Sequence, residues 1–149
     1  MSAMHRSDVA IAGTRPTRRV PRWSWLRAAG FALAGVIHLL PLAGIVGGDT
    51  LNRLYGVRVD DAGLELLLRH RALLFGLLGM LLIGAIRLPG WRMPALVAGG
   101  SSAAAFLLLA GGMSAHHPAI QRVILFDLVA LGALVAAASS HLALRRGAS

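Results

Sequence analysis

Residues 64–86 read LELLLRHRALLFGLLGMLLIGAI, and this stretch decides the fold. It is long enough to cross a bilayer as a helix, which takes about 20 predominantly apolar residues. Three further apolar stretches, residues 26–47, 94–113 and 119–143, account for most of the remaining chain. The sequence therefore predicts an all-α integral membrane protein, in which residues 26–143 form one four-helix bundle.

The composition agrees with a membrane protein and excludes several kinds of site. Of the 149 residues, 56% are hydrophobic and only 14% are charged, whereas about 25% of the residues of a soluble domain are charged. Because the chain has no cysteine, it cannot form disulfides, thiolate metal sites or a cysteine nucleophile. It also lacks P-loop, Rossmann, HExxH and GxSxG motifs, so no sequence feature points to an enzyme.

All 15 basic residues are arginine, and the net charge is +9. The arginines flank the apolar stretches, where they set topology and meet lipid headgroups. We therefore expect the lipid bilayer, and not nucleic acid, as the partner. Positive charge gathers on the cytoplasmic side of membrane proteins. Ten arginines lie inside if both termini are cytoplasmic: Arg6, Arg15, Arg18, Arg19, Arg22, Arg27, Arg87, Arg92, Arg145 and Arg146. The arginine distribution thus predicts two cytoplasmic termini.

The segments outside the spans carry local signals. Residues 1–25 and 144–149 are predicted to be basic cytoplasmic tails, the first of them flexible. Pro41 should kink the first span, because it has no N–H and clashes with the preceding turn. Residues 51–55 are expected to form a short interfacial helix. Residues 60–63, DDAG, are typical of a turn and a helix start with an acidic N-cap.

Small residues follow one face of several spans, where they allow helices to approach closely. They are Ala72, Gly76 and Gly79 in the second span, residues 99–104 in the third, and Ala130, Ala133 and Ala137 in the fourth.

Ionisable residues inside the spans form the candidate site, a predicted intramembrane polar layer. They are His38 in the first span, Glu65, Arg69, His70 and Arg71 in the second, and Asp127 in the fourth. With a rise of about 1.5 Å per residue, the two histidines and the aspartate lie on the order of 10–14 Å from the same side. Such groups usually face the bundle interior or a water-filled cavity. The layer either only fixes helix register or also lines a small cavity for a proton, an anion or a headgroup.

Charge pairing predicts how this layer is arranged. Arg69 and Arg71 point about 200° apart around their helix. Arg69 shares its face with the small residues, so we expect it to pair with Asp127, with Glu65 as a second acceptor. Arg71 should then snorkel towards the near interface.

Two other classes of function stay open beside a non-enzymatic membrane protein. His38 and His70 could ligate a haem iron from opposite sides, although no cofactor is predicted from these residues alone. His116 and His117 form a turn without further ligands at metal-binding spacing, so we predict no metal site. The alternatives are a subunit of a membrane redox system that binds quinone or haem, and a small transporter. Other membrane subunits or self-association would then be needed, since four short spans enclose little volume.

The stretch from LYGV at residues 54–57 to LLLRHRALLFGLLG at residues 66–79 resembles small bacterial four-span proteins of DoxX-like layout. The resemblance covers about residues 26–143 and implies a multi-pass protein of the bacterial inner membrane. It implies no activity, although some DoxX relatives are subunits of quinone-linked oxidoreductases. Similar sequences often carry the name phosphopantetheine adenylyltransferase. The residues argue against that activity, because residues 116–118, HHP, do not match its HxGH phosphate site.

Overall fold

A computed structural model describes residues 22–56, 59–113 and 117–146. Its helices are α1 (Arg22–Leu39), the 3-10 helix η1 (Leu40–Val46), α2 (Gly48–Tyr55), α3 (Ala62–Arg87), the 3-10 helix η2 (Pro89–Trp91), α4 (Arg92–Gly111) and α5 (Pro118–Arg146). Four stretches are long and apolar enough to cross a membrane: Arg22–Val46, Ala62–Arg87, Pro89–Gly111 and Pro118–Ala143. The described residues contain no strand, and the prediction of an all-α protein with four such helices is confirmed.

The outer helices run further than the predicted spans. Helix α1 begins at Arg22, so residues 22–25, predicted as part of the flexible tail, form its first turn. Helix α5 continues to Arg146, past the predicted end at residue 143. The remainder of the two predicted tails, residues 1–21 and 147–149, lies outside the described residues.

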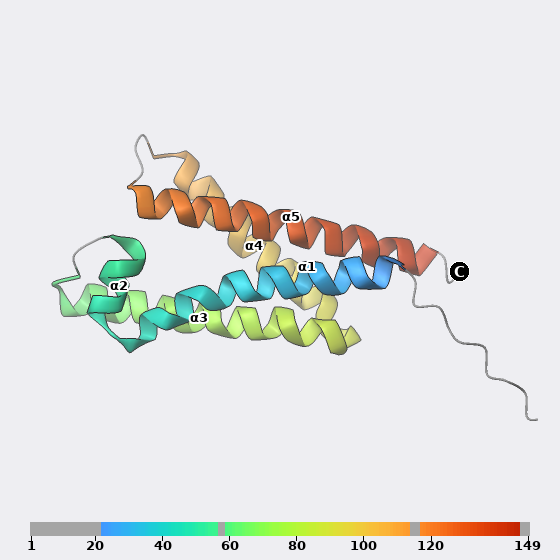
Figure 1. The fold of residues 1–149 in the computed structure, drawn as a ribbon, viewed down its shortest axis with the longest axis horizontal. Coiled ribbons are helices and arrows are strands. Elements are labelled where there is room, and N and C mark those ends of the chain that lie inside the picture. The colour runs from blue at the N-terminus through green and yellow to red at the C-terminus, as the bar shows by residue number, and fades with distance from the viewer. Residues whose placement is uncertain (1–21, 57–58, 114–116, 147–149) are drawn as a thin grey trace, which may run out of the picture.

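Helix α1 occupies the middle of the bundle. Figure 1 shows it running beside α5 on one side and α3 on the other, while α4 crosses the bundle at an angle. The beginning of α1 and the end of α5 lie at the same end of the bundle, and α2 lies at the opposite end. We call the latter the α2 end.

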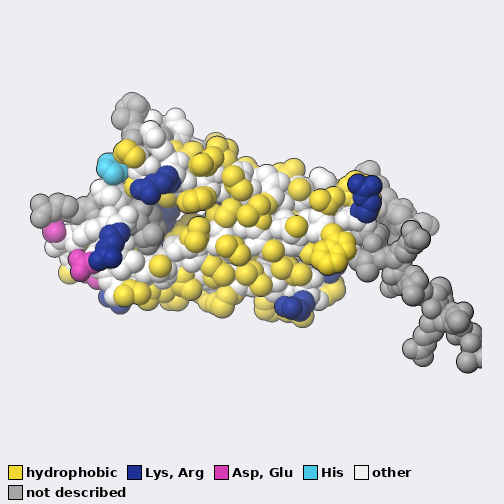
Figure 2. Space-filling model, viewed as in Figure 1, with side chains coloured by type: hydrophobic (Ala, Val, Ile, Leu, Met, Phe, Trp, Pro, Cys, Tyr) yellow, Lys and Arg dark blue, Asp and Glu magenta, His cyan; other side chains and the backbone are white. Residues whose placement is uncertain are grey.

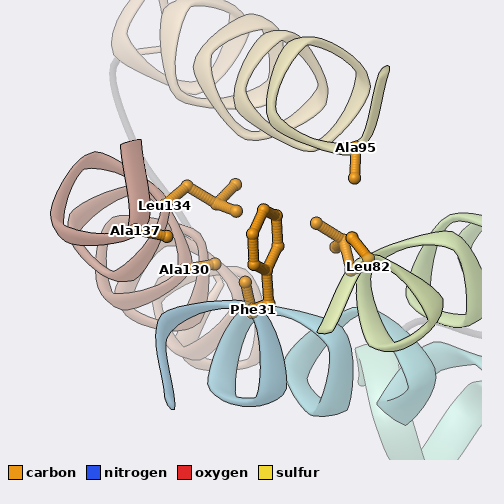
Figure 3. Packing of buried hydrophobic residues seen from close by; sticks show 8 residues of the cluster. Phe31, Leu82, Ala95, Ala130, Leu134 and Ala137 are labelled. Carbon is orange, nitrogen blue, oxygen red and sulfur yellow. The ribbon is translucent and has the colours of Figure 1, made fainter. Parts of the chain in front are cut away.

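The core is built around one aromatic ring and many small side chains. Phe31 of α1 is fully buried. In Figure 3 its ring lies between Leu134 of α5 and Leu82 of α3, with Ala95 of α4 closing the group. Since lipid gives helices no hydrophobic drive to associate, such dense packing supplies the attraction between them.

Glycines bring α1 into backbone contact with both neighbours. A Cβ at Gly30 would lie 2.5 Å from the carbonyl oxygen of Ala133 in α5. A Cβ at Gly79 in α3 would lie 2.9 Å from the carbonyl oxygen of Gly35 in α1. These distances are too short for any side chain, so both contacts require glycine on at least one helix. The predicted use of small residues for close packing is confirmed at Gly79 and at Ala133.

The path of the chain changes at the α2 end. Helix α1 ends at Leu39, and η1 continues it with Pro41 in its first turn, where the missing N–H is tolerated. The chain then forms the short helix predicted near residues 51–55, which is α2. The Asp61 side chain caps α3 by accepting a hydrogen bond from the Leu64 N–H at 2.7 Å, as the sequence predicts.

The surface has the charge distribution of a membrane protein. Figure 2 shows an apolar band over the middle of the bundle, with arginines at both ends. Large side chains such as Leu66, Leu77, Val97 and Leu108 are exposed on the long helices. A continuous apolar surface of this kind needs an apolar environment, and the four long helices make this a multi-pass membrane protein.

We predict that Gly30→Ala destabilises the protein, because the added methyl would meet the α5 backbone. Overpacking of this kind costs about 1–3 kcal/mol. Gly132→Ala is the matched control, since a Cβ at Gly132 has no neighbour within 4 Å; it should be neutral or gain about 0.5–1 kcal/mol. Thermal unfolding in mild detergent measures both. Equal stability of the two variants would contradict the close contact between α1 and α5.

Candidate binding cavity

A cavity of about 450 Å³ lies between α1, η1, α3 and α5 at the α2 end. This volume is in the range of pockets that hold one small molecule. Most of its lining is apolar, and its polar groups come from four different elements. The lining residues are Ile37, His38, Leu40, Pro41, Ala43, Arg53, Arg71, Phe75, Ala119, Arg122, Val123, Phe126 and Asp127.

Exposure separates the mouth of the cavity from its floor. Five lining residues are exposed and mark the mouth: Leu40, Ala43, Arg53, Arg122 and Phe126. His38 is only 1% exposed and Asp127 only 5%, so these two side chains form the floor. The cavity therefore opens between η1, α2 and α5 and ends on two buried ionisable groups.

The His38 ring has one nitrogen with a hydrogen-bond partner and one without. Its Nδ1 lies 2.8 Å from the carbonyl oxygen of Ala34, one turn earlier in α1. A carbonyl oxygen can only accept, so Nδ1 carries a proton and donates to it. Nε2 is buried and has no hydrogen-bond partner. The ring stacks on Phe75 with 5.7 Å between centroids, which fixes its position.

Asp127 links three helices electrostatically. Its carboxylate, on α5, interacts with His38 of α1 and with Arg71 of α3. A charged group inside a membrane protein is stabilised by partners of this kind and by exclusion from lipid. Asp127 is thus the point at which the predicted polar layer converges.

Aromatic rings hold Arg71 close to this floor. The Arg71 guanidinium carbon lies 5.2 Å from the centre of the Phe75 ring and 5.6 Å from that of Phe106 in α4. Both distances are within the range of cation–π attraction, which grows as water is excluded. The two rings therefore give a cation in the bundle a favourable environment that apolar side chains alone would not.

The predicted pair of Arg69 with Asp127 is wrong. The predicted second acceptor, Glu65 on the same helix, does pair with Arg69, with 3.5 Å between Nη1 and Oε1, and the Arg69 side chain is 46% exposed. The small-residue face on which the prediction rested is filled by α1 and η1: Leu42 covers Gly76, and Leu39 covers Gly79. No space is left for an arginine there, so Arg71 takes the inward position and Arg69 the outward one.

The structure divides the predicted polar layer into two groups. His38, Arg71 and Asp127 meet at the cavity, whereas Glu65, Arg69 and His70 do not line it. Because His70 is exposed, the structure does not bring it together with His38, as a haem iron between them would require. Within the described ranges, no three His, Asp or Glu side chains are grouped to hold a metal ion. His116 lies outside the described residues.

Sequence reasoning missed the arginines of the mouth and the aromatic walls. Arg53 and Arg122 are not among the predicted residues of the polar layer, yet both line the cavity. Phe75 follows Arg71 by four residues, the spacing at which two helical side chains contact each other. That spacing could have indicated that Arg71, rather than Arg69, lies in an aromatic environment.

The comparisons with known proteins found no matching family model, no matching curated protein and no matching solved structure.

We predict that Arg71 and Asp127 are coupled in a double-mutant cycle, while Arg69 and Asp127 are not. Arg71→Gln and Asp127→Asn should each destabilise the protein in detergent unfolding. The double variant should recover about 0.5–3 kcal/mol of the summed losses, the usual range for interacting residues. The control cycle with Arg69→Gln should be additive within about 0.5 kcal/mol. If Arg69 were coupled to Asp127 more strongly than Arg71 is, the result would contradict this arrangement and support the pair of Arg69 with Asp127 that the sequence predicted.

Proposed function

We propose that this chain is a small, non-enzymatic membrane protein that binds one small molecule in the cavity at the α2 end. The observation that carries the proposal is the cavity of about 450 Å³, whose mostly apolar lining also contains the ionisable groups of His38, Arg71 and Asp127. Small-molecule sites in proteins are typically lined by apolar and aromatic side chains with a few polar groups. A bound molecule would fill this space.

A purely structural role for the polar layer explains the site less well. An electrostatic interaction that only fixed helix register would need Arg71 and Asp127, but it would not need a cavity. Protein interiors are packed densely, and unfilled space lowers stability. The mouth also carries two exposed arginines, Arg53 and Arg122. A polar layer that only fixed the register of the helices would not require them.

Location and orientation are part of the same proposal. We infer that the protein lies in a bacterial inner membrane with both termini in the cytoplasm, supported by the excess of arginines on that side. The mouth of the cavity would then face the periplasm, because α2 lies at the end of the bundle opposite the beginning of α1 and the end of α5.

A quinone-binding subunit of a membrane redox system is the second candidate. The aromatic and apolar lining of the cavity, which includes Phe75, Phe126 and Val123, favours it, since flat apolar rings bind in pockets of this composition. In such a system another subunit would supply the electrons. Purification in mild detergent followed by a spectrum of the extracted small molecules separates this candidate from redox-inactive ligands.

We predict that filling the mouth removes the bound molecule. Ala43 lines the cavity and is exposed, whereas Ala136 is exposed on α5 away from it. Ala43→Phe should lower the amount of co-purified small molecule at least tenfold, as measured by mass spectrometry of extracts from detergent-purified protein. Ala136→Phe should match the unmodified chain. Equal amounts from both variants, or no small molecule from the unmodified chain, would contradict a binding function.

A further inference from the structure

A second charged region lies at the end of the bundle opposite the α2 end, where α1 begins and α3 is followed by α4. Its arginines differ in exposure: Arg22 and Arg87 are exposed, whereas Arg27 and Arg92 are partly buried. Figure 2 shows the acidic side chains of its face at the α2 end. The carboxylates of the described residues lie at the α2 end or in the cavity, and they are Asp49, Asp60, Asp61, Glu65 and Asp127. Within this described set, Arg27 and Arg92 have no counter-ion.

The packing of the core brings Arg27 and Arg92 to one place. In Figure 3 the ring of Phe31 points from α1 towards α4, from which Ala95 faces the same group. Arg27 precedes Phe31 by four residues and Arg92 precedes Ala95 by three, and side chains at these spacings lie on the same face of a helix. The two arginines therefore lie one turn beyond the core contact, on the facing sides of α1 and α4. They also act on each other electrostatically, which agrees with this placement.

Helix α3 holds Arg92 in a defined orientation. The Arg92 Nε donates a hydrogen bond to the carbonyl oxygen of Ala85 at 3.3 Å. In a regular helix this carbonyl would accept from the residue four positions later, which here is Pro89 and has no N–H. The bond to Ala85 uses only one of the five N–H donors of the guanidinium group. The donors on the two Nη atoms remain for an anion.

The surroundings indicate which anion fits. Two partly buried charges of the same sign repel each other, and an anion bound to both removes this repulsion. Guanidinium groups match the oxygens of a phosphate. Trp23, Trp25 and Trp91 are exposed at this end, and tryptophan is enriched at the level of lipid headgroups. Trp91 directly precedes Arg92, and its ring lies against Gly84 of α3. A phosphate that carries acyl chains therefore fits this position better than a soluble anion.

We propose that Arg27 and Arg92 form a specific site for one anionic phospholipid. The phosphate binds both guanidinium groups, and the acyl chains extend over exposed apolar side chains next to them in the sequence, such as Leu26 and Met93. A zwitterionic headgroup fits less well, because it brings its own cation to the two arginines. The site is separate from the cavity at the α2 end and does not depend on what the cavity binds.

Binding of phosphatidylglycerol to the detergent-purified chain tests this site. In native mass spectrometry, the unmodified chain should bind its first phosphatidylglycerol about tenfold more tightly than its first phosphatidylcholine. Arg27→Gln and Arg92→Gln should each lower the affinity for phosphatidylglycerol about tenfold, the loss expected for a hydrogen bond to a charged group. Arg87→Gln removes the same charge from an exposed position at the same end, and it should lower this affinity about twofold or less.

Thermal unfolding separates lipid binding from a structural role of the two arginines. Without anionic lipid, Arg27→Gln should unfold at the same temperature as the unmodified chain or at a higher one, because it removes one of two charges that repel each other. Added phosphatidylglycerol should raise the unfolding temperature of the unmodified chain and of Arg87→Gln. The same lipid should raise that of Arg27→Gln much less.

Three results would overturn the lipid site. The first is an equal loss of phosphatidylglycerol affinity in Arg27→Gln and Arg87→Gln. The second is displacement of bound phosphatidylglycerol by millimolar inorganic phosphate, which would assign the two arginines to a soluble anion. The third concerns Asp8, the one acidic residue outside the described part of the chain. A lower unfolding temperature of Asp8→Asn in lipid-free detergent, absent in the Arg27→Gln background, would make Asp8 the partner of the arginines instead.

Discussion

The carboxylate of Asp127 cannot face lipid without a large cost in free energy, and the α2 end of the bundle is arranged around this constraint. Two ionisable groups of other helices act on it electrostatically, His38 of α1 and Arg71 of α3. The opposite half of the bundle is held differently, by the backbone contacts of Gly30 and Gly79. Where α1 ends before Pro41, close helix packing gives way to a cavity lined by the polar groups.

The architecture could be predicted because it depends on the bilayer. A fixed hydrocarbon thickness requires long apolar helices, and these are visible as unbroken stretches of sequence. The ends of individual helices could also be predicted, because they depend on residues that are adjacent in the sequence. Pro41 cannot continue the backbone hydrogen bonds of α1, and the Asp61 carboxylate can accept from the exposed N–H groups that begin α3. The depth of His38 and Asp127 followed from helix rise alone, and both line one cavity.

The arrangement of charges could not be predicted in the same way, because it depends on which helix covers which face. The small face of α3 was expected to receive Arg69, but Leu39 and Leu42 occupy it. Arg71 then turns inward, where Phe106 of α4, distant in sequence, contributes to its environment. The arginines of the mouth were missed for a related reason. Arg53 and Arg122 are near the ends of their segments, and only the packing of η1 and α5 makes them neighbours of one cavity.

Thiol labelling most directly tests whether the polar layer opens to water as a cavity. The chain has no cysteine, so single cysteines can be introduced without background reactivity. Ile37 lines the cavity, whereas its neighbour Val36 is exposed on the lipid-facing side of α1. In membrane vesicles, a small charged thiol reagent added on the side opposite the termini should label Ile37→Cys and leave Val36→Cys unlabelled. Equal labelling of the two positions, or no labelling of Ile37→Cys from that side, would contradict a water-accessible cavity.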